Sequence, residues 1–117
     1  MWKDDATAQD LLLAARAIRE FVQGMTHDQF RDDFKTQCAV VQQITVLGEA
    51  TKRLSPDYRA RHPSIPWQEI AGMRDRCVHG YDNINLQFVW EVTQVHAPQL
   101  ADYLGKIVPM PPPDCRF

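Results

Sequence analysis

An arginine, a histidine and a tyrosine follow one another closely within the run from Gly72 to Tyr81. Arg74 carries a permanent positive charge and a planar fork of donors that matches a phosphate group. His79 is the side chain best able to give and take protons near neutral pH. With the phenol of Tyr81, these groups are suited to chemistry on phosphodiesters. The spacing alone is weak evidence, because an arginine and a histidine five positions apart often arise by chance.

The same residues also have an ordinary structural interpretation. Arg74 could form a surface ion pair with Asp75 or Glu49, and His79 could cap carbonyl groups at a helix end. In the catalytic interpretation, Asp75, Glu49 and Arg76 are supporting candidates beside the motif. A charged residue within a helix is more often simply solvated. The rest of the chain therefore has to decide between the two interpretations.

Length and composition are those of one globular domain, with 117 residues of which 44% are hydrophobic. We expect a helical domain over residues 1–107 and a proline-rich, extended or disordered tail over residues 108–117. The acidic start does not resemble a signal peptide, and no apolar run approaches the roughly 20 residues that span a bilayer. The sequence therefore predicts a cytoplasmic protein that is not inserted in a membrane.

The cysteines and histidines show no spacing typical of a cofactor or metal site. Cys38, Cys77 and Cys115 suggest neither a disulfide framework nor a thiolate cluster. We expect reduced thiols, two of them in the core, and no metal or cofactor. The other histidines, His27, His62 and His96, share no common spacing and are assigned no role.

Charge is unevenly distributed along the chain. The whole chain has a net charge of -2, which argues against a protein that coats nucleic acid indiscriminately. The segment from Lys52 to Arg76 nevertheless carries six basic and three acidic residues. Such a local basic surface suits the binding of one phosphate-bearing ligand, although solvated helix ends would give the same balance.

Hydrophobic periodicity predicts helices almost throughout. The expected helices cover residues 8–22, 33–54, 56–61, 66–79 and 86–107, with a turn around His27 and a rigid connector over residues 62–66. The second helix has two apolar stripes, one with Phe34, Cys38, Val41 and Gly48 and the other with Val40, Ile44, Leu47 and Leu54. Two stripes predict burial on two sides.

The helix that carries the motif should begin with Pro66 in its first turn and close at Gly80 in the left-handed conformation. His79 would then lie in the last helical turn and Tyr81 just outside. Residues five apart on an ideal helix point about 140° away from each other. Arg74 and His79 would therefore need a second copy of the chain to meet at one site.

The last helix gives a separate reason to expect a dimer. After a capping loop over residues 82–85, it presents one apolar surface with Trp90 and another with Phe88. A small bundle has too little interior for both, so the second surface could form a homodimer interface or be covered by loops. Pro98 should kink or break this helix near Ala97, because a proline in a helix interior costs about 3 kcal/mol or more.

Four segments together resemble the HepT-like branch of the HEPN superfamily. They are residues 47–54 (LGEATKRL), 62–67 (HPSIPW), 70–76 (IAGMRDR) and 78–81 (VHGY). The R-x4-H-x-Y signature of that branch is met by Arg74, His79 and Tyr81, and the resemblance extends from about Leu11 to Leu104. Two features depart from the pattern. Cys77 stands where the family more often has an aliphatic residue, and the proline-rich tail is not part of the family pattern.

The resemblance implies an all-α, antiparallel HEPN-type bundle of four to five helices that forms a homodimer. It implies a metal-independent RNA endonuclease that acts as the toxin of a HepT–MntA toxin–antitoxin module and cuts a tRNA or an mRNA. Its partner would be an MntA-type nucleotidyltransferase antitoxin that silences it by attaching AMP to Tyr81. Arg74 and His79 would be the catalytic residues.

The physical chemistry of these residues is compatible with that activity. His79 could act as general base on a ribose 2′-hydroxyl or as general acid to the departing oxygen. Arg74 could hold the scissile phosphate and stabilise its charge in the transition state. The alternative from another class is a catalytically silent helical subunit that binds a nucleotidyltransferase and holds nucleotide or RNA on the basic surface.

Overall fold

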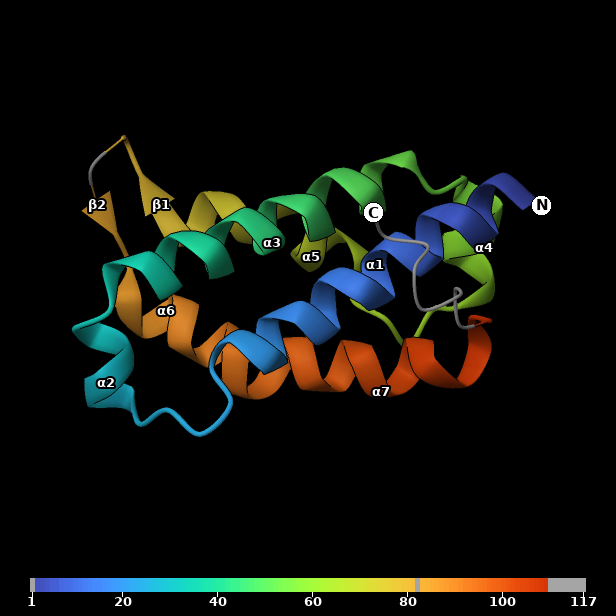
Figure 1. Ribbon diagram of the computed structural model, residues 1–117. Helices are drawn as coiled ribbons and strands as arrows, with labels where there is room; N and C mark the ends of the chain where they lie inside the picture. Colours follow the sequence, from blue (N-terminus) through green and yellow to red (C-terminus); the bar gives the residue numbers. More distant parts are fainter. Residues whose placement is uncertain (1, 82, 110–117) are drawn as a thin grey trace.

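A computed structural model describes residues 2–81 and 83–109 of the chain (Figure 1). The long helices α1 (Trp2–Phe21), α3 (Phe34–Arg53) and α7 (Ala97–Ile107) form the main body, with α5 (Trp67–Cys77) packed on α3. The shorter elements are α2 (His27–Arg31), α4 (Pro56–Arg61), α6 (Leu86–Glu91), the π-helical turn η1 (Val92–His96) and the strands β1 (Val78–His79) and β2 (Asn83–Ile84). The predicted all-α class is confirmed, with one small hairpin added.

The core lies where α1 packs against both α3 and α7. One apolar stripe of α3 faces it, and Val40, Ile44, Leu47 and Leu54 are all at most 2% exposed. Burying one such side chain contributes roughly 1.5–3 kcal/mol relative to leaving it in water. Within the described residues, no helix is long and apolar enough to cross a membrane.

The second stripe of α3 does not follow the prediction of burial on two sides. Gly48 is buried, because α5 approaches α3 so closely there that an added Cβ would lie 3.2 Å from the Ala71 carbonyl oxygen. Phe34, in contrast, is 68% exposed, and Cys38 is also exposed. Of the two cysteines that the structure describes, only Cys77 is buried, whereas the prediction placed two in the core. Cys115 lies outside the described residues.

Side-chain caps fix most of the predicted helix starts. Asp33 accepts a hydrogen bond from the backbone N–H of Thr36, and Ser55 and Asn85 cap α4 and α6 in the same way. The turn expected around His27 is instead the short helix α2, which is begun by a capping box between Thr26 and Gln29.

The first helix begins six residues before the predicted start at Ala8. Asp4 lies in its first turn, where a carboxylate suits the helix dipole. The carboxylate accepts hydrogen bonds from the backbone N–H and the hydroxyl of Ser55, at 3.0 and 2.7 Å. This contact with a residue 51 positions away fixes the helix start, and hydrophobic periodicity could not indicate it.

The last helical segment bears on two further predictions. The irregularity expected near Ala97 takes the form of the wide π-helical turn η1, which ends at His96, and α7 then continues through Pro98. Most of both apolar surfaces is buried within one chain, since Phe88 is 8%, Val92 0% and Ala97 1% exposed, and only Val95, at 42%, is left exposed among the described apolar residues of η1. Unburied apolar surface on this helix is therefore not a reason to expect a dimer.

Helix α7 ends at Ile107, where the last helix was predicted to end, but the chain continues to pack just beyond it. Val108 is buried, and the carbonyl oxygen of Pro109 accepts a hydrogen bond from the Gln9 amide at 3.2 Å. The predicted extended or disordered state of the tail falls mainly on residues 110–117, which lie outside the described residues.

Candidate active site

The motif does not sit entirely on one helix. Helix α5 ends at Cys77, and Val78 takes an extended conformation that starts the antiparallel hairpin of β1 and β2. Gly80 is left-handed, with φ of +72°, but it serves the hairpin turn rather than the helix end. The prediction that His79 lies in the last helical turn is wrong. The Asn85 backbone N–H, which donates to the Cys77 carbonyl at 2.8 Å, helps to hold the chain in this path.

Arg74 lies in the last turn of α5 with its side chain 48% exposed. Its guanidinium is 3.6 Å from the carboxylate of Asp75, which is itself 86% exposed. An ion pair of this kind between solvated groups contributes little to stability. Arg74 is therefore held only loosely and is accessible to an anionic ligand.

A groove of about 490 Å³ opens beside Arg74, between α3 and the hairpin. Val78 and Ile84 line it together, because they are opposite each other in the hairpin register. Tyr81, in the hairpin turn, also lines this groove and is 97% exposed. The structure thus brings two of the three motif residues, Arg74 and Tyr81, to one surface.

His79 lies on the other side of the hairpin. Successive side chains of a strand point to opposite faces, and Val78 faces the groove while His79 pairs with Asn83. The imidazole is exposed and has no hydrogen bond or ion pair with any described residue. One chain therefore keeps His79 away from the groove surface of Arg74, as expected, but through strand alternation rather than helical geometry.

Arg76, a supporting candidate, has a structural role in this chain. Its guanidinium lies 4.0 Å from the centre of the Phe88 ring on α6, and Glu69 is within 3.9 Å. A cation stacked on an aromatic face in this way stabilises the packing of α5 on α6. Arg76 does not line the groove that Arg74 and Tyr81 share.

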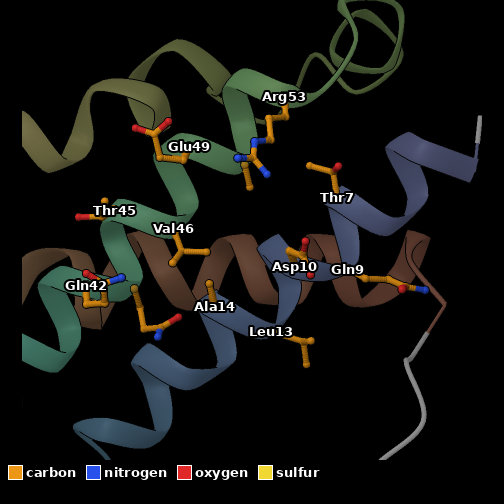
Figure 2. A pocket seen from close by; sticks show the side chains of 12 residues that line it. Thr7, Gln9, Asp10, Leu13, Ala14, Gln42, Thr45, Val46, Glu49 and Arg53 are labelled. Carbon is orange, nitrogen blue, oxygen red and sulfur yellow. The ribbon is translucent and has the colours of Figure 1, made fainter. Parts of the chain in front are cut away.

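Glu49, the other supporting candidate, belongs to a different hollow, of about 540 Å³, between α1 and α3. Figure 2 shows its carboxylate directed away from α1, with Arg53 one turn further along α3. Glu49 pairs with Lys52 at 3.8 Å, so the ion pair with Arg74 that was one structural interpretation does not form. With Asp10, Glu49 and Arg53 on its walls, this hollow has mixed charge and does not match a phosphate chain.

Cys77, between the motif residues in sequence, is not available for chemistry. It is fully buried, and burial raises the pKa of its thiol to about 12 despite the opposing effect of Arg76 and Arg74. The thiol is therefore protonated at neutral pH and packs as a small apolar group. Within the part of the chain that the structure describes, no three His, Cys, Asp or Glu side chains are grouped to hold a metal ion.

The α3 wall of the groove is the part that the sequence analysis missed. Phe34, Gln42 and Thr45 line it opposite the motif. The signal that could have indicated this wall was Phe34. This aromatic residue directly follows the Asp33 cap and does not belong to the buried stripe of Val40 and Ile44. Nothing in the spacing showed that this outer stripe of α3 would lie beside Arg74.

Comparison with known proteins identifies the family of the chain. The family model described as "Ribonuclease HepT-like" matches residues 11–107, which is most of the helical body and includes the whole motif. The chain belongs to this family. The comparison supports a ribonuclease function, because the chain's relatives are also assigned to ribonucleases by name.

Two relatives illustrate the level of similarity. A Thermococcus cleftensis protein, named "Probable ribonuclease HepT", is 33% identical over 99 residues, which cover 85% of this chain and 90% of the relative. A Methanocaldococcus jannaschii protein, also assigned as an RNase by name, is 39% identical over 99 residues, 85% of this chain and 82% of the relative. No solved structure gives a significant match.

Proposed function

We propose that this chain is a metal-independent RNA endonuclease, the toxin of a HepT–MntA-type module. The observation that carries the proposal is the exposure of Arg74, His79 and Tyr81 at one end of a chain whose family is ribonuclease HepT-like. Polar side chains that the fold leaves exposed with few partners are suited to binding a ligand rather than to stabilising the fold.

The proposed reaction uses the ribose 2′-hydroxyl next to the scissile bond as nucleophile. His79 takes its proton, the 2′-oxygen bonds to phosphorus, and the bond to the 5′-oxygen of the next nucleotide breaks. Water protonates the departing oxygen. Arg74 binds the non-bridging oxygens and stabilises their charge in the transition state. The products are a 2′,3′-cyclic phosphate and a 5′-hydroxyl end.

The experiment is cleavage of a mixed-sequence RNA by the purified full chain in the presence of EDTA. Because the nucleophile belongs to the substrate, cleavage should continue without divalent metal and leave cyclic-phosphate ends. His79→Ala, purified in parallel, controls for contaminating nucleases. Cleavage that EDTA abolishes, or that His79→Ala retains, would contradict the mechanism.

A homodimer would unite Arg74 and His79, which one chain keeps on different faces. We place the two α5 helices near the two-fold axis, so that Arg74 of one copy and His79 of the other border one cleft. A mixture of the inactive Arg74→Ala and His79→Ala chains tests this sharply. After subunit exchange in an equal mixture, half of the dimers contain one chain of each variant, and each of these has one intact site and one inactive site. The mixture should therefore regain up to about one quarter of the wild-type rate.

Two results would contradict the shared site. One is a mixture that stays inactive although subunit exchange is confirmed by mass. The other is light scattering that finds a fully active monomer at micromolar concentration. If neither the wild-type homodimer nor the mixture of variants cuts RNA, the alternative is favoured, in which the chain is a catalytically silent binding subunit.

The proposed control of the toxin is AMP attached to the Tyr81 hydroxyl by an MntA-type nucleotidyltransferase. The phenol is 97% exposed, so a partner enzyme can reach it. In that reaction the phenolic oxygen attacks the α-phosphate of ATP, pyrophosphate leaves, and the phenolic proton passes to solvent. The new phosphodiester would lie in the groove of Arg74 and block RNA by bulk and by pairing with the guanidinium.

Co-expression with an MntA-type nucleotidyltransferase tests this control. The intact mass should rise by one or more AMP units and cleavage should fall, whereas Tyr81→Phe should keep its mass and escape silencing. Tyr103→Phe, which changes a half-buried tyrosine on α7, is the matched control and should still be modified. If the chain is inhibited but its mass is unchanged, the partner inhibits it by binding alone, and the proposed attachment of AMP is wrong.

A further inference from the structure

The groove beside Arg74 combines apolar and polar lining in a pattern that suits a nucleobase. Val41, Val78 and Ile84 give it an aliphatic surface, and all three are half-buried. Gln42 and Thr45 add an amide and a hydroxyl. A base has two flat apolar faces and a polar rim, so it needs both kinds of surface at once.

Two aromatic side chains at this groove are left without partners by the fold. Phe34 is 68% exposed and Tyr81 is 97% exposed, and neither has a ring contact with a described residue. Phe30 and Phe88, in contrast, are at most 8% exposed. Exposed rings beside a cation are the common means of holding unstacked bases, because every base has a π-face.

The polar groups of the groove are also available. The Gln42 side chain has no hydrogen bond with any described residue, so its amide can both donate and accept. The Thr45 hydroxyl donates to the Val41 carbonyl at 3.0 Å, which leaves its oxygen free to accept. These two groups can contact the edge of a base that lies against the aliphatic surface.

We propose that this groove binds one unpaired nucleobase of the RNA next to the phosphate held by Arg74, with Phe34 stacking on it and Gln42 contacting its edge. The proposal rests on the proposed ribonuclease function and adds residues of α3 to its substrate site. Arg74 lines the same groove, so the phosphate attached to that nucleotide falls within reach of a cation. A base held in a duplex cannot enter, so the site selects single-stranded RNA.

A second copy of the chain is the other candidate occupant of this groove. The proposed phosphate site at Arg74 has to remain open to substrate, and the groove that Arg74 lines has to remain open with it. The free amide and the cation at its edges also complement a nucleotide better than an apolar protein surface. The experiment below separates the two occupants.

The first arm compares variants of Phe34 on the single-stranded RNA that the wild-type chain cuts. Phe34→Ala should lower kcat/KM roughly 5- to 100-fold, the range typical for loss of one base–aromatic stack. Phe34→Leu, which keeps apolar bulk but loses the ring, should resemble Phe34→Ala, and Phe34→Tyr should recover most of the loss. Phe21→Ala removes another exposed phenylalanine, 39% exposed at the end of α1, and should have no effect.

The second arm removes the base instead of the side chain. An abasic nucleotide is placed in turn on each side of the cleaved bond. At one position the abasic nucleotide should lower cleavage by the wild-type chain as much as Phe34→Ala lowers cleavage of normal RNA. Phe34→Ala should cut that abasic RNA no more slowly than the wild-type chain does. Gln42→Ala should change the preference among the four bases at the same position and at no other.

Each outcome decides the proposal. If Phe34→Ala lowers cleavage of normal and abasic RNA equally and also dissociates a dimer, a second copy occupies the groove and the base site is wrong. If the wild-type chain cuts no RNA, the proposed ribonuclease function is wrong, but the base site can still be tested by RNA binding. An RNA with 2-aminopurine should then be quenched by the wild-type chain and not by Phe34→Ala; equal quenching would overturn the site.

Discussion

The two ends of the molecule treat their polar side chains in opposite ways. At the end that contains α4 and the start of α1 (Figure 1), Asp4 is 6% exposed and its carboxylate accepts two hydrogen bonds from Ser55. At the hairpin end, His79 and Tyr81 are exposed and have no side-chain partner among the described residues. The first end stabilises the bundle, and the second leaves its groups free for a ligand. Substitutions at the two ends should therefore separate stability from activity.

The largest effect is expected at the hairpin end. His79→Ala and Arg74→Ala should each lower the rate of RNA cleavage about 10²–10⁴-fold, the usual contribution of a positioned acid–base or charge-stabilising group. The melting temperature should hardly change, because both side chains are exposed. Gel-based cleavage rates and circular dichroism melting curves measure the two quantities. If the variants cut less RNA only because less of the protein is folded, the hairpin end also serves stability, and the contrast between the two ends is wrong.

The next effect belongs to the opposite end and to stability. Leu54, which ends α3 beside α4, is 2% exposed. Leu54→Ala should cost about 2–5 kcal/mol of unfolding free energy, through lost burial and the cavity left behind. Urea titration measures this cost, and cleavage per folded chain should stay near the wild-type rate. A well-folded Leu54→Ala chain that fails to cut RNA would show that the two ends are coupled.

Asp4 should make the stability of that end depend on pH. The hydrogen bonds from the backbone N–H and the hydroxyl of Ser55 lower the pKa of Asp4 below the usual value of an aspartate. A carboxyl whose pKa is lowered by folding adds stability above its unfolded pKa, and the contribution is lost as the pH falls through the folded value. Urea midpoints should therefore fall below about pH 4 in the wild type, and less so in Asp4→Asn. Asp5→Asn, which changes an exposed neighbour, should follow the wild-type curve.

The same contrast explains which features the sequence could predict. The helix starts at Asp33, Ser55 and Asn85 depend on side chains that accept a hydrogen bond from the backbone three residues ahead, so local sequence determines them. The start of α1 depends on Asp4 meeting Ser55, 51 residues away, and no local pattern contains that contact. Local signals therefore predicted these three starts, although the equally local capping box of Thr26 and Gln29 was not recognised and α2 was expected as a turn.

The hairpin shows why the candidate site was predicted only in part. Gly80 after an apparent helix is a normal helix terminator, and two-residue strands are too short to give an alternating pattern. The pairing of Val78 with Ile84 ends the helix earlier and moves His79 to the other face. The motif residues were thus identified from residue type and resemblance, whereas their relative placement and the α3 wall depend on tertiary packing.

The smallest effect is expected for Arg76, which is two residues from Arg74 on the same helix. Its guanidinium stacks on Phe88, and 58% of its side chain is exposed, so the contact resembles exposed cation–π pairs that contribute about 0.5–1 kcal/mol. Arg76→Ala should therefore lower the melting temperature by a few degrees and leave RNA cleavage unchanged. Arg76→Lys, which keeps the charge but loses the planar group, should recover only part of the stability. If Arg76→Ala instead slows cleavage as strongly as Arg74→Ala, the basic surface acts as a whole on the RNA backbone, and the assignment of phosphate binding to Arg74 alone is wrong.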